Sequence, residues 1–173
     1  MSDASAAPKD GARPDIIAST ETRRSPLLRG ARRRVVMADV DAARILYFGT
    51  PFRWFEELFT LWLQSIGHSA GHMLSTGVST PVVASHCEYL RPIGLDDLVD
   101  LELRAGAIGE RSFSVHGFAV KENERGSALQ FEAAHVWVEF DELDHGVALR
   151  AKPLPSWLRS SLREEQFPDA GTE

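Results

Sequence analysis

The sequence predicts an α+β protein in which one long apolar helix precedes a run of antiparallel strands. The first observation is the segment from Thr50 to Ile66, where apolar residues recur at helical spacing. The second is the change of pattern after Thr80, where apolar and polar residues alternate as they do in strands. Strands that follow one another after a helix favour an antiparallel sheet over an alternating α/β fold. We therefore expect a five-stranded antiparallel sheet wrapped around one long central helix.

Length and composition favour a single globular domain. The chain has 173 residues, 43% hydrophobic and 25% charged, which is ordinary for a globular protein with a proper core. A single cysteine, Cys87, excludes a disulfide framework within the chain and favours a reducing compartment. The sequence shows neither a long apolar run nor a signal peptide, so we expect a cytoplasmic protein without a membrane partner.

Charge is distributed unevenly, although the formal net charge is −6. Residues 1–34 are basic and the remainder is acidic. A basic arm can bind nucleic acid, but here no aromatic residues are interleaved with it. We expect no nucleic-acid partner and interpret residues 1–30 as a flexible extension. The domain itself is expected over residues 31–165, with a flexible tail over residues 166–173.

The long helix is the centre of the predicted fold. Gly49 interrupts the chain before it, Thr50 can cap it, and Pro51 suits its first position, where a missing N–H costs nothing. Its apolar positions are Phe52, Trp54, Phe55, Leu58, Phe59, Leu61, Trp62 and Ile66. Such a helix must be covered on several sides, and one sheet covers only one of them. We expect a second copy of the chain to cover the rest.

The remaining elements follow from turn residues and alternation. The glycine-rich stretch 68–79 is expected to be a loop, and a short helix is expected near Ser156–Arg163. The predicted strands are Arg32–Ala38, Thr80–Leu90, Asp97–Ala105, Ser112–Lys121 and Ala128–Phe140.

An acidic loop with Asp39 and Asp41 leads through an apolar segment, Ile45 to Phe48, into the helix. This run resembles the hotdog-fold acyl-CoA thioesterases of the 4-hydroxybenzoyl-CoA thioesterase type, and the resemblance covers about residues 31–158. The sequence departs from the family pattern at Arg44, where glycine is usual, so the loop can follow a different path. A histidine that assists catalysis in one branch of the family is replaced here by Phe48.

The resemblance implies a set of functional residues. Asp41 matches the catalytic carboxylate, which acts either as nucleophile or as general base towards water. The N–H groups of Phe48 and Gly49 match the donors that stabilise the oxyanion at the helix start. The residues expected to contact substrate are Tyr47, Glu56 and Thr80 around the acyl group, and Arg111, Arg150 and Lys152 around the coenzyme A phosphates.

The function implied is hydrolysis of an acyl-CoA to the free acid and coenzyme A, and we expect the acyl group to be aromatic and hydroxybenzoyl-like. We expect no metal and no cofactor besides the coenzyme A of the substrate, and a homo-oligomer, either a dimer or a homotetramer. One alternative is a catalytically silent acyl-CoA-binding domain. Another is an esterase that uses Ser69, because residues 67–71 spell G-x-S-x-G, the pattern of a nucleophile elbow.

Overall fold

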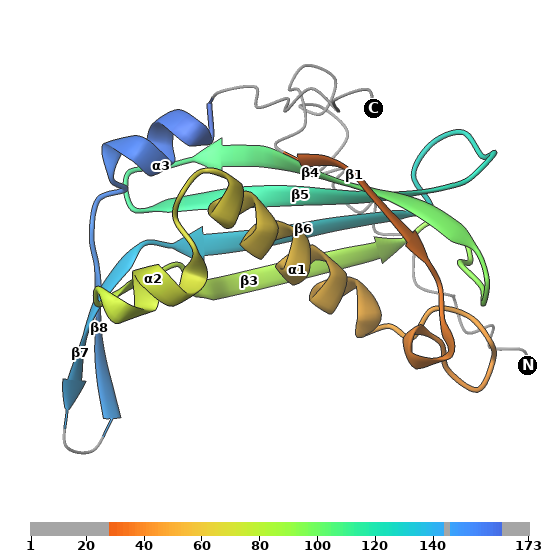
Figure 1. Ribbon diagram of the computed structural model, residues 1–173, viewed down its shortest axis with the longest axis horizontal. Helices are drawn as coiled ribbons and strands as arrows, with labels where there is room; N and C mark the ends of the chain where they lie inside the picture. Colours follow the sequence, from red (N-terminus) through yellow and green to blue (C-terminus); the bar gives the residue numbers. More distant parts are fainter. Residues whose placement is uncertain (1–27, 144–145, 164–173) are drawn as a thin grey trace, which may run out of the picture.

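The main sheet of the protein has five antiparallel strands. The computed structural model describes residues 28–143 and 146–163. The strand order is β1-β4-β5-β6-β3, and every neighbouring pair is antiparallel. The sheet curves across the molecule in Figure 1. Its strands are β1 (Leu28–Arg34), β3 (Val82–Tyr89), β4 (Leu98–Ile108), β5 (Ser112–Lys121) and β6 (Leu129–Val136). The predicted α+β class is therefore confirmed.

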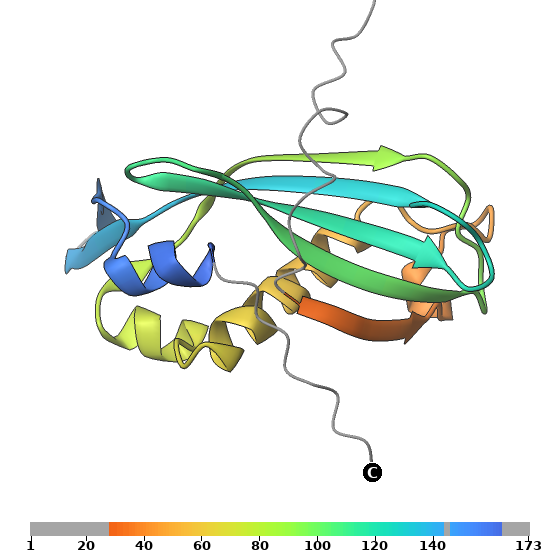
Figure 2. The ribbon, with the colours of Figure 1, turned by 90° about the horizontal axis from the view of Figure 1, so that it is seen from above.

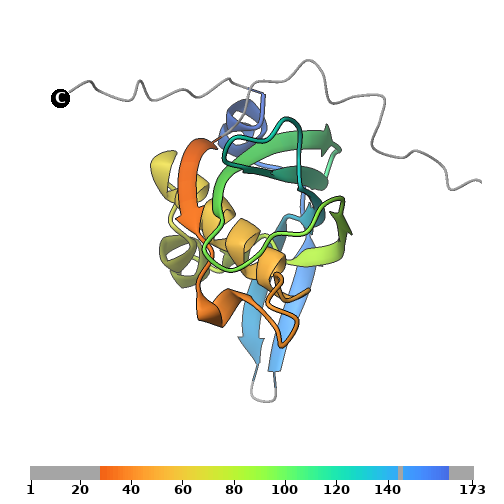
Figure 3. The same cartoon turned by 90° about the vertical axis from the view of Figure 1, so that its right-hand side faces the viewer.

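Helix α1 (Thr50–Ser65) packs on one face of this sheet. Two shorter helices, α2 (Ala70–Ser75) and α3 (Ser156–Ser161), lie on the same face (Figure 2). Seen from the end, β1 curls beside α1, so that the helix lies in a trough of the sheet (Figure 3). Arg33 of β1 closes this side with an ion pair to Glu57 at 2.6 Å. The chain itself thus covers part of the helix surface that the sequence analysis expects a second copy to cover.

The core lies between α1 and the inward side chains of the strands. Strand β4 shows the predicted alternation, with Val99, Leu101, Leu103 and Ala105 all buried. The helix contributes Trp54, Phe55, Leu58, Phe59, Trp62 and Leu63. Full burial of one large apolar side chain contributes about 1.5–3 kcal/mol, so these two rows dominate the stability of the fold.

A glycine sets how closely α1 approaches the sheet. Gly117 of β5 faces Phe55, and a Cβ atom added at this glycine would lie 2.3 Å from the Phe55 ring. That ring is fully buried and stacks on Phe131 of β6 with centroids 4.9 Å apart. The helix therefore rests on the backbone of a central strand.

A second, three-stranded sheet was not predicted. It has the order β2-β7-β8 and consists of β2 (Val78–Ser79), β7 (Val138–Leu143) and β8 (Gly146–Ala151). The single long strand predicted over Ala128–Phe140 is wrong, because the chain changes partners at Trp137. Its N–H donates to the Arg111 carbonyl beside β5, and its carbonyl accepts from Lys152 beside β8. The β7–β8 hairpin then projects from one end of the molecule (Figure 1).

Other element boundaries also differ from those expected. Strand β1 begins at Leu28 and ends at Arg34, and a 3-10 turn, η2, occupies Met37–Asp39, where the sequence predicted strand to Ala38. The expected loop 68–79 contains α2, which begins at a serine cap. Most of the predicted flexible extension, residues 1–27, lies outside the described residues. The whole predicted tail, residues 166–173, lies outside them too. The three-residue overlap at 28–30 belongs to β1.

Candidate active site

The loop before α1 is anchored by Asp39, whose side chain is only 5% exposed. Its carboxylate accepts hydrogen bonds from the Val36 N–H at 3.1 Å and the Trp54 indole at 3.3 Å, and it pairs with Arg53. Its carbonyl accepts the Thr50 hydroxyl at 3.0 Å. Because all these groups lie at the start of α1 or just before the loop, Asp39 fixes where the helix begins.

Asp41 differs from Asp39 in being exposed. The loop closes on itself, since the Asp41 N–H donates to the Ile45 carbonyl at 3.0 Å. One carboxylate oxygen of Asp41 accepts the Ala43 N–H at 2.8 Å, while its other oxygen has no hydrogen-bond partner among the described residues. The local turn thus orients the carboxylate and leaves one oxygen available.

Arg44 has a backbone conformation that glycine adopts readily and other residues adopt rarely. Its φ is +62°, in the left-handed region. Its N–H donates to the Asp41 carbonyl at 3.0 Å, so the turn forms although the glycine is missing. A left-handed conformation costs a side-chain-bearing residue about 1–2 kcal/mol. Whether the loop path differs from that of the family stays a prediction.

The start of α1 has no side-chain cap. Gly49 is the N-cap residue, and Thr50, expected to cap, instead uses its hydroxyl to bind the Asp39 carbonyl. In the part of the chain that the structure describes, neither the Phe48 N–H nor the Gly49 N–H donates a hydrogen bond. These amides stand at the positive end of the helix dipole, where they can receive a negatively charged oxygen.

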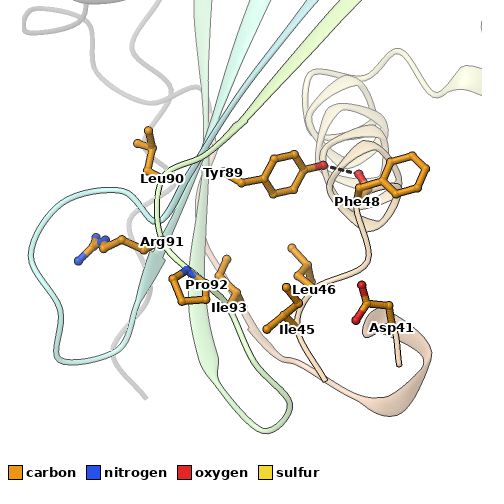
Figure 4. Close-up of a pocket in the computed structure, with 9 residues that line it drawn as sticks. All are labelled: Asp41, Ile45, Leu46, Phe48, Tyr89, Leu90, Arg91, Pro92 and Ile93. Atoms are coloured by element: carbon orange, nitrogen blue, oxygen red, sulfur yellow. Dashed lines mark hydrogen bonds between the residues drawn. The ribbon is translucent and has the colours of Figure 1, made fainter. Parts of the chain in front are cut away.

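A cavity of about 400 Å³ lies beside this helix start (Figure 4). The loop and the turn after β3 form its walls. It is lined by Asp41, Ile45, Leu46, Phe48, Tyr89, Leu90, Arg91, Pro92 and Ile93. Small-molecule sites typically measure about 300–1,000 Å³ and are mostly apolar with a few polar groups. The cavity therefore has the size and character of a site for an apolar group, with one carboxylate at its edge.

Tyr89 joins the two sides of this cavity. Its hydroxyl donates a hydrogen bond to the Phe48 carbonyl, as the dashed line in Figure 4 shows. Burial raises the pKa of the Tyr89 hydroxyl, and a hydrogen bond with Cys87 raises it further. Burial likewise raises the pKa of the Cys87 thiol to about 11, so this cysteine is a poor nucleophile.

The structure brings only some of the predicted substrate residues near this cavity. The Tyr47 ring packs against Phe48, with centroids 4.6 Å apart, and covers Gly49. Glu56 is exposed and accepts the Thr60 hydroxyl at 2.9 Å. Thr80 lies before β3, and its carbonyl accepts from the His135 ring at 2.8 Å. Neither Glu56 nor Thr80 lines the cavity.

The three predicted basic residues do not line the cavity either. Arg150 pairs with Asp141 at 3.2 Å and Lys152 pairs with Glu139 at 3.1 Å, both across the β7–β8 hairpin. Arg111 is exposed beside Glu110. The hairpin and the start of α1 lie at opposite ends of the molecule (Figure 1).

Ser69 has the role of a helix cap. Its hydroxyl oxygen accepts the His72 N–H at 3.3 Å at the start of α2. A nucleophile elbow needs a strained turn between a strand and a helix, together with a histidine base. Ser69 instead follows α1 and has ordinary extended dihedral angles, φ −60° and ψ 144°. The geometry therefore disfavours the serine esterase alternative.

Tyr89 lines the cavity and contacts Phe48, and sequence reasoning missed it. Alternation along the strand Thr80–Leu90 could have placed Tyr89 on the same face as Cys87. It could not have shown that this face meets the helix start, because that depends on how β3 pairs within the sheet.

No three His, Cys, Asp or Glu side chains in residues 28–143 and 146–163 are grouped so that they could hold a metal ion. None of the helices within these ranges is long and apolar enough to cross a membrane.

A carboxylate and free amides around an apolar cavity can support hydrolysis at an acyl carbonyl, so fold and site together fit the class of acyl-group hydrolases. Comparison with known families makes this specific. Residues 35–162 match the model of the thioesterase-like superfamily, and the chain belongs to that family. The resemblance in the sequence is thereby confirmed, and the chain stands among the thioester hydrolases.

Individual relatives agree with this assignment. A 1,4-dihydroxy-2-naphthoyl-CoA hydrolase from Picosynechococcus is 32% identical over 94 residues, a match that spans 54% of this chain and 64% of that protein, slightly less than two thirds of its length. A protein of the same name from Synechococcus is 26% identical over 141 residues, a match that spans 75% of this chain and 88% of that protein. The solved structure of the 1,4-dihydroxy-2-naphthoyl-CoA thioesterase from Synechocystis shares the fold, with a TM-score of 0.68 and 20% identity. The match covers 79% of this chain and 96% of that one.

Proposed function

We propose that this protein hydrolyses an aromatic acyl-CoA to the free acid and coenzyme A, with the reaction centred on Asp41 and the start of α1. The observation that carries the proposal is the meeting of an available carboxylate oxygen, two unpaired amides and an apolar cavity at one place. The five-stranded sheet around α1 fits the hotdog arrangement expected from the sequence.

We assign each part a step. The thioester carbonyl oxygen accepts hydrogen bonds from the Phe48 and Gly49 amides, which stabilise the negative charge that develops when the carbonyl carbon is attacked. Asp41 either takes a proton from the attacking water or attacks the carbon itself to give an anhydride that water then cleaves. In both routes the C–S bond breaks, and coenzyme A leaves as the thiolate and takes up a proton.

An aromatic acyl group suits the cavity walls. Ile45, Phe48 and Leu90 are 44%, 66% and 50% exposed and offer apolar surface to a ligand, whereas Leu46 and Ile93 also line the cavity but are already buried. A flat ring buried there removes these surfaces from water, which contributes about 25 cal/mol per Å². The relative from Picosynechococcus is named for a substrate with a two-ring aromatic acyl group, which supports this choice.

Two copies of the chain would form the working unit. Strand β3 is at the edge of the sheet, and its Val82 and Val83 are 52% and 64% exposed. An exposed apolar edge favours pairing with another strand, here β3 of a second copy. A second copy also offers a way to bring Arg111, Arg150 and Lys152 towards the coenzyme A of a substrate whose acyl group lies at the other chain's Asp41.

Steady-state turnover of a panel of aromatic and straight-chain acyl-CoA substrates tests the proposal. We expect aromatic substrates to have the higher kcat/KM. Asp41→Asn should lower kcat by a factor on the order of 10² or more while the fold persists, since it removes the charge but little volume. The matched control is Asp96→Asn, because Asp96 is exposed, lies outside the cavity and has a φ of +67°, which asparagine tolerates.

The same experiment separates the alternatives. Wild-type turnover retained by Asp41→Asn would refute the role of Asp41. Binding of an acyl-CoA without turnover would favour the silent domain, and loss of activity in Ser69→Ala alone would favour the esterase. Sedimentation at micromolar concentration should show at least a dimer, and a 19 kDa species alone would refute the pairing of copies along β3.

A further inference from the structure

The peptide group between Phe48 and Gly49 connects the loop to α1 and carries one of the two proposed oxyanion donors. No cis peptide bond occurs among the described residues, so this group is trans. In a trans peptide the C=O and N–H bonds point in opposite directions. Whatever fixes the Phe48 carbonyl therefore also fixes the direction of the Gly49 N–H.

Within the described ranges, the Tyr89 hydroxyl is the one donor to the Phe48 carbonyl. The helix does not hold this carbonyl, because the first backbone bond beside it runs from the Thr50 N–H to the Tyr47 carbonyl at 2.9 Å. Gly49 adds no side chain that would restrict rotation of the peptide plane. Among the described residues no other group donates to this carbonyl, so without Tyr89 the peptide plane is free to turn.

Tyr89 itself is well placed to hold this contact. It is the last residue of β3 and lies 41 positions after Phe48 in the sequence. It pairs across the sheet with Leu129, which is buried. A tyrosine hydroxyl is protonated at neutral pH, and the pKa of Tyr89 is raised further, so it remains a donor. A hydrogen bond at a carbonyl also polarises the amide and strengthens its N–H as a donor.

We propose that Tyr89 is a positioning residue: its hydroxyl holds the Phe48–Gly49 peptide so that the Gly49 N–H faces away from β3 and is ready for the thioester oxygen. This inference rests on the proposed function. Tyr89 acts through the peptide and does not touch the reacting atoms.

Tyr89→Phe tests the proposal because it removes the hydroxyl and keeps the ring in the cavity wall. We expect kcat to fall about tenfold, while KM for an aromatic acyl-CoA stays within about threefold. The Gly49 amide resonance in a 15N–1H spectrum should also shift, since its nitrogen shares a peptide with the released carbonyl. Thermal unfolding of the variant reports separately on any purely structural role.

Ser75→Ala is the matched control. It also deletes a hydroxyl that donates to a backbone carbonyl, that of His72 at 2.8 Å, but in α2 and outside the cavity. It should leave kcat and the Gly49 resonance unchanged.

Unchanged kcat in Tyr89→Phe overturns the proposal, even where Asp41→Asn is inactive and the proposed function stands. A wild-type protein that cleaves no thioester in the panel overturns the proposed function instead. The Gly49 resonance then decides the remaining question, because an unshifted signal in Tyr89→Phe also overturns the positioning of the peptide, and a shifted one supports it.

Discussion

Replacement of Asp39 by asparagine should weaken the fold, whereas the same change at Asp41 should not. Asp39→Asn removes the negative charge from a buried group that binds Arg53, Trp54 and the Val36 N–H. An amide side chain keeps one acceptor oxygen and presents an NH₂ group to partners that are themselves donors. At least one donor at the helix start is therefore left without an acceptor.

The magnitude follows from these contacts. A hydrogen bond to a charged group contributes about 1.5–3 kcal/mol, and the loss of one partner from a buried ion pair costs about 3–5 kcal/mol. Arg53 is half exposed, so water compensates part of that loss. We expect a net loss of about 2–4 kcal/mol, a large share of the roughly 5–15 kcal/mol by which domains are stable.

Urea unfolding followed by tryptophan fluorescence measures this loss, since Trp54 contacts Asp39 directly. Asp41→Asn is the internal comparison and should change the unfolding free energy by less than about 1 kcal/mol, because Asp41 is exposed and binds one loop amide. An Asp39→Asn protein within about 0.5 kcal/mol of wild type would show that this carboxylate does not anchor the helix.

Three further predictions use the same unfolding assay. Arg44→Gly should stabilise the protein by about 0.5–1 kcal/mol, because it removes the left-handed strain of φ +62° at some cost in chain entropy; a loss of stability would argue against strain there. Gly117→Ala should cost about 1–3 kcal/mol, because the new Cβ meets the buried Phe55 ring; a neutral effect would mean that the helix can retreat. Burial lowers the pKa of His135, so the unfolded chain takes up a proton first, and stability should fall as pH drops below about 6.5. His135→Gln should flatten that decline, and an unchanged pH profile would contradict this reasoning.

The sequence predicted best those elements whose structure depends on neighbouring residues. The alternation in β4 and the Gly49–Thr50–Pro51 start of α1 depend on neighbouring residues only, and both appear in the structure with small shifts. The break at Trp137 could not be predicted. Its flanking valines continue one apolar run, while the change of partner from β5 to β8 depends on residues distant in the sequence.

The candidate site divides in the same way. Asp41 and the amides of Phe48 and Gly49 belong to one continuous segment, so the resemblance could assign them together, and their roles stay predictions. Tyr89 reaches Phe48 only because β3 forms the sheet edge next to the helix start. Arg150 and Asp41, both assigned to the same substrate by the resemblance, are far apart within one chain. The β7–β8 hairpin that carries Arg150 lies at the opposite end of the molecule from the start of α1 (Figure 1).

The contact between Phe55 and Gly117 has a mechanical consequence for the helix start. A ring seated on strand backbone and stacked on Phe131 prevents α1 from sliding or rolling, because a dense core has no room for a displaced ring. Gly49 lies less than two turns before this contact, so the position of the helix start is fixed relative to β5, while the direction of the Gly49 N–H depends on the Phe48–Gly49 peptide. The cavity walls, in contrast, come from the loop and the turn after β3. Substitutions at Ile45, Leu90 or Pro92 can therefore reshape the space for an acyl group while α1 itself keeps its place on the sheet.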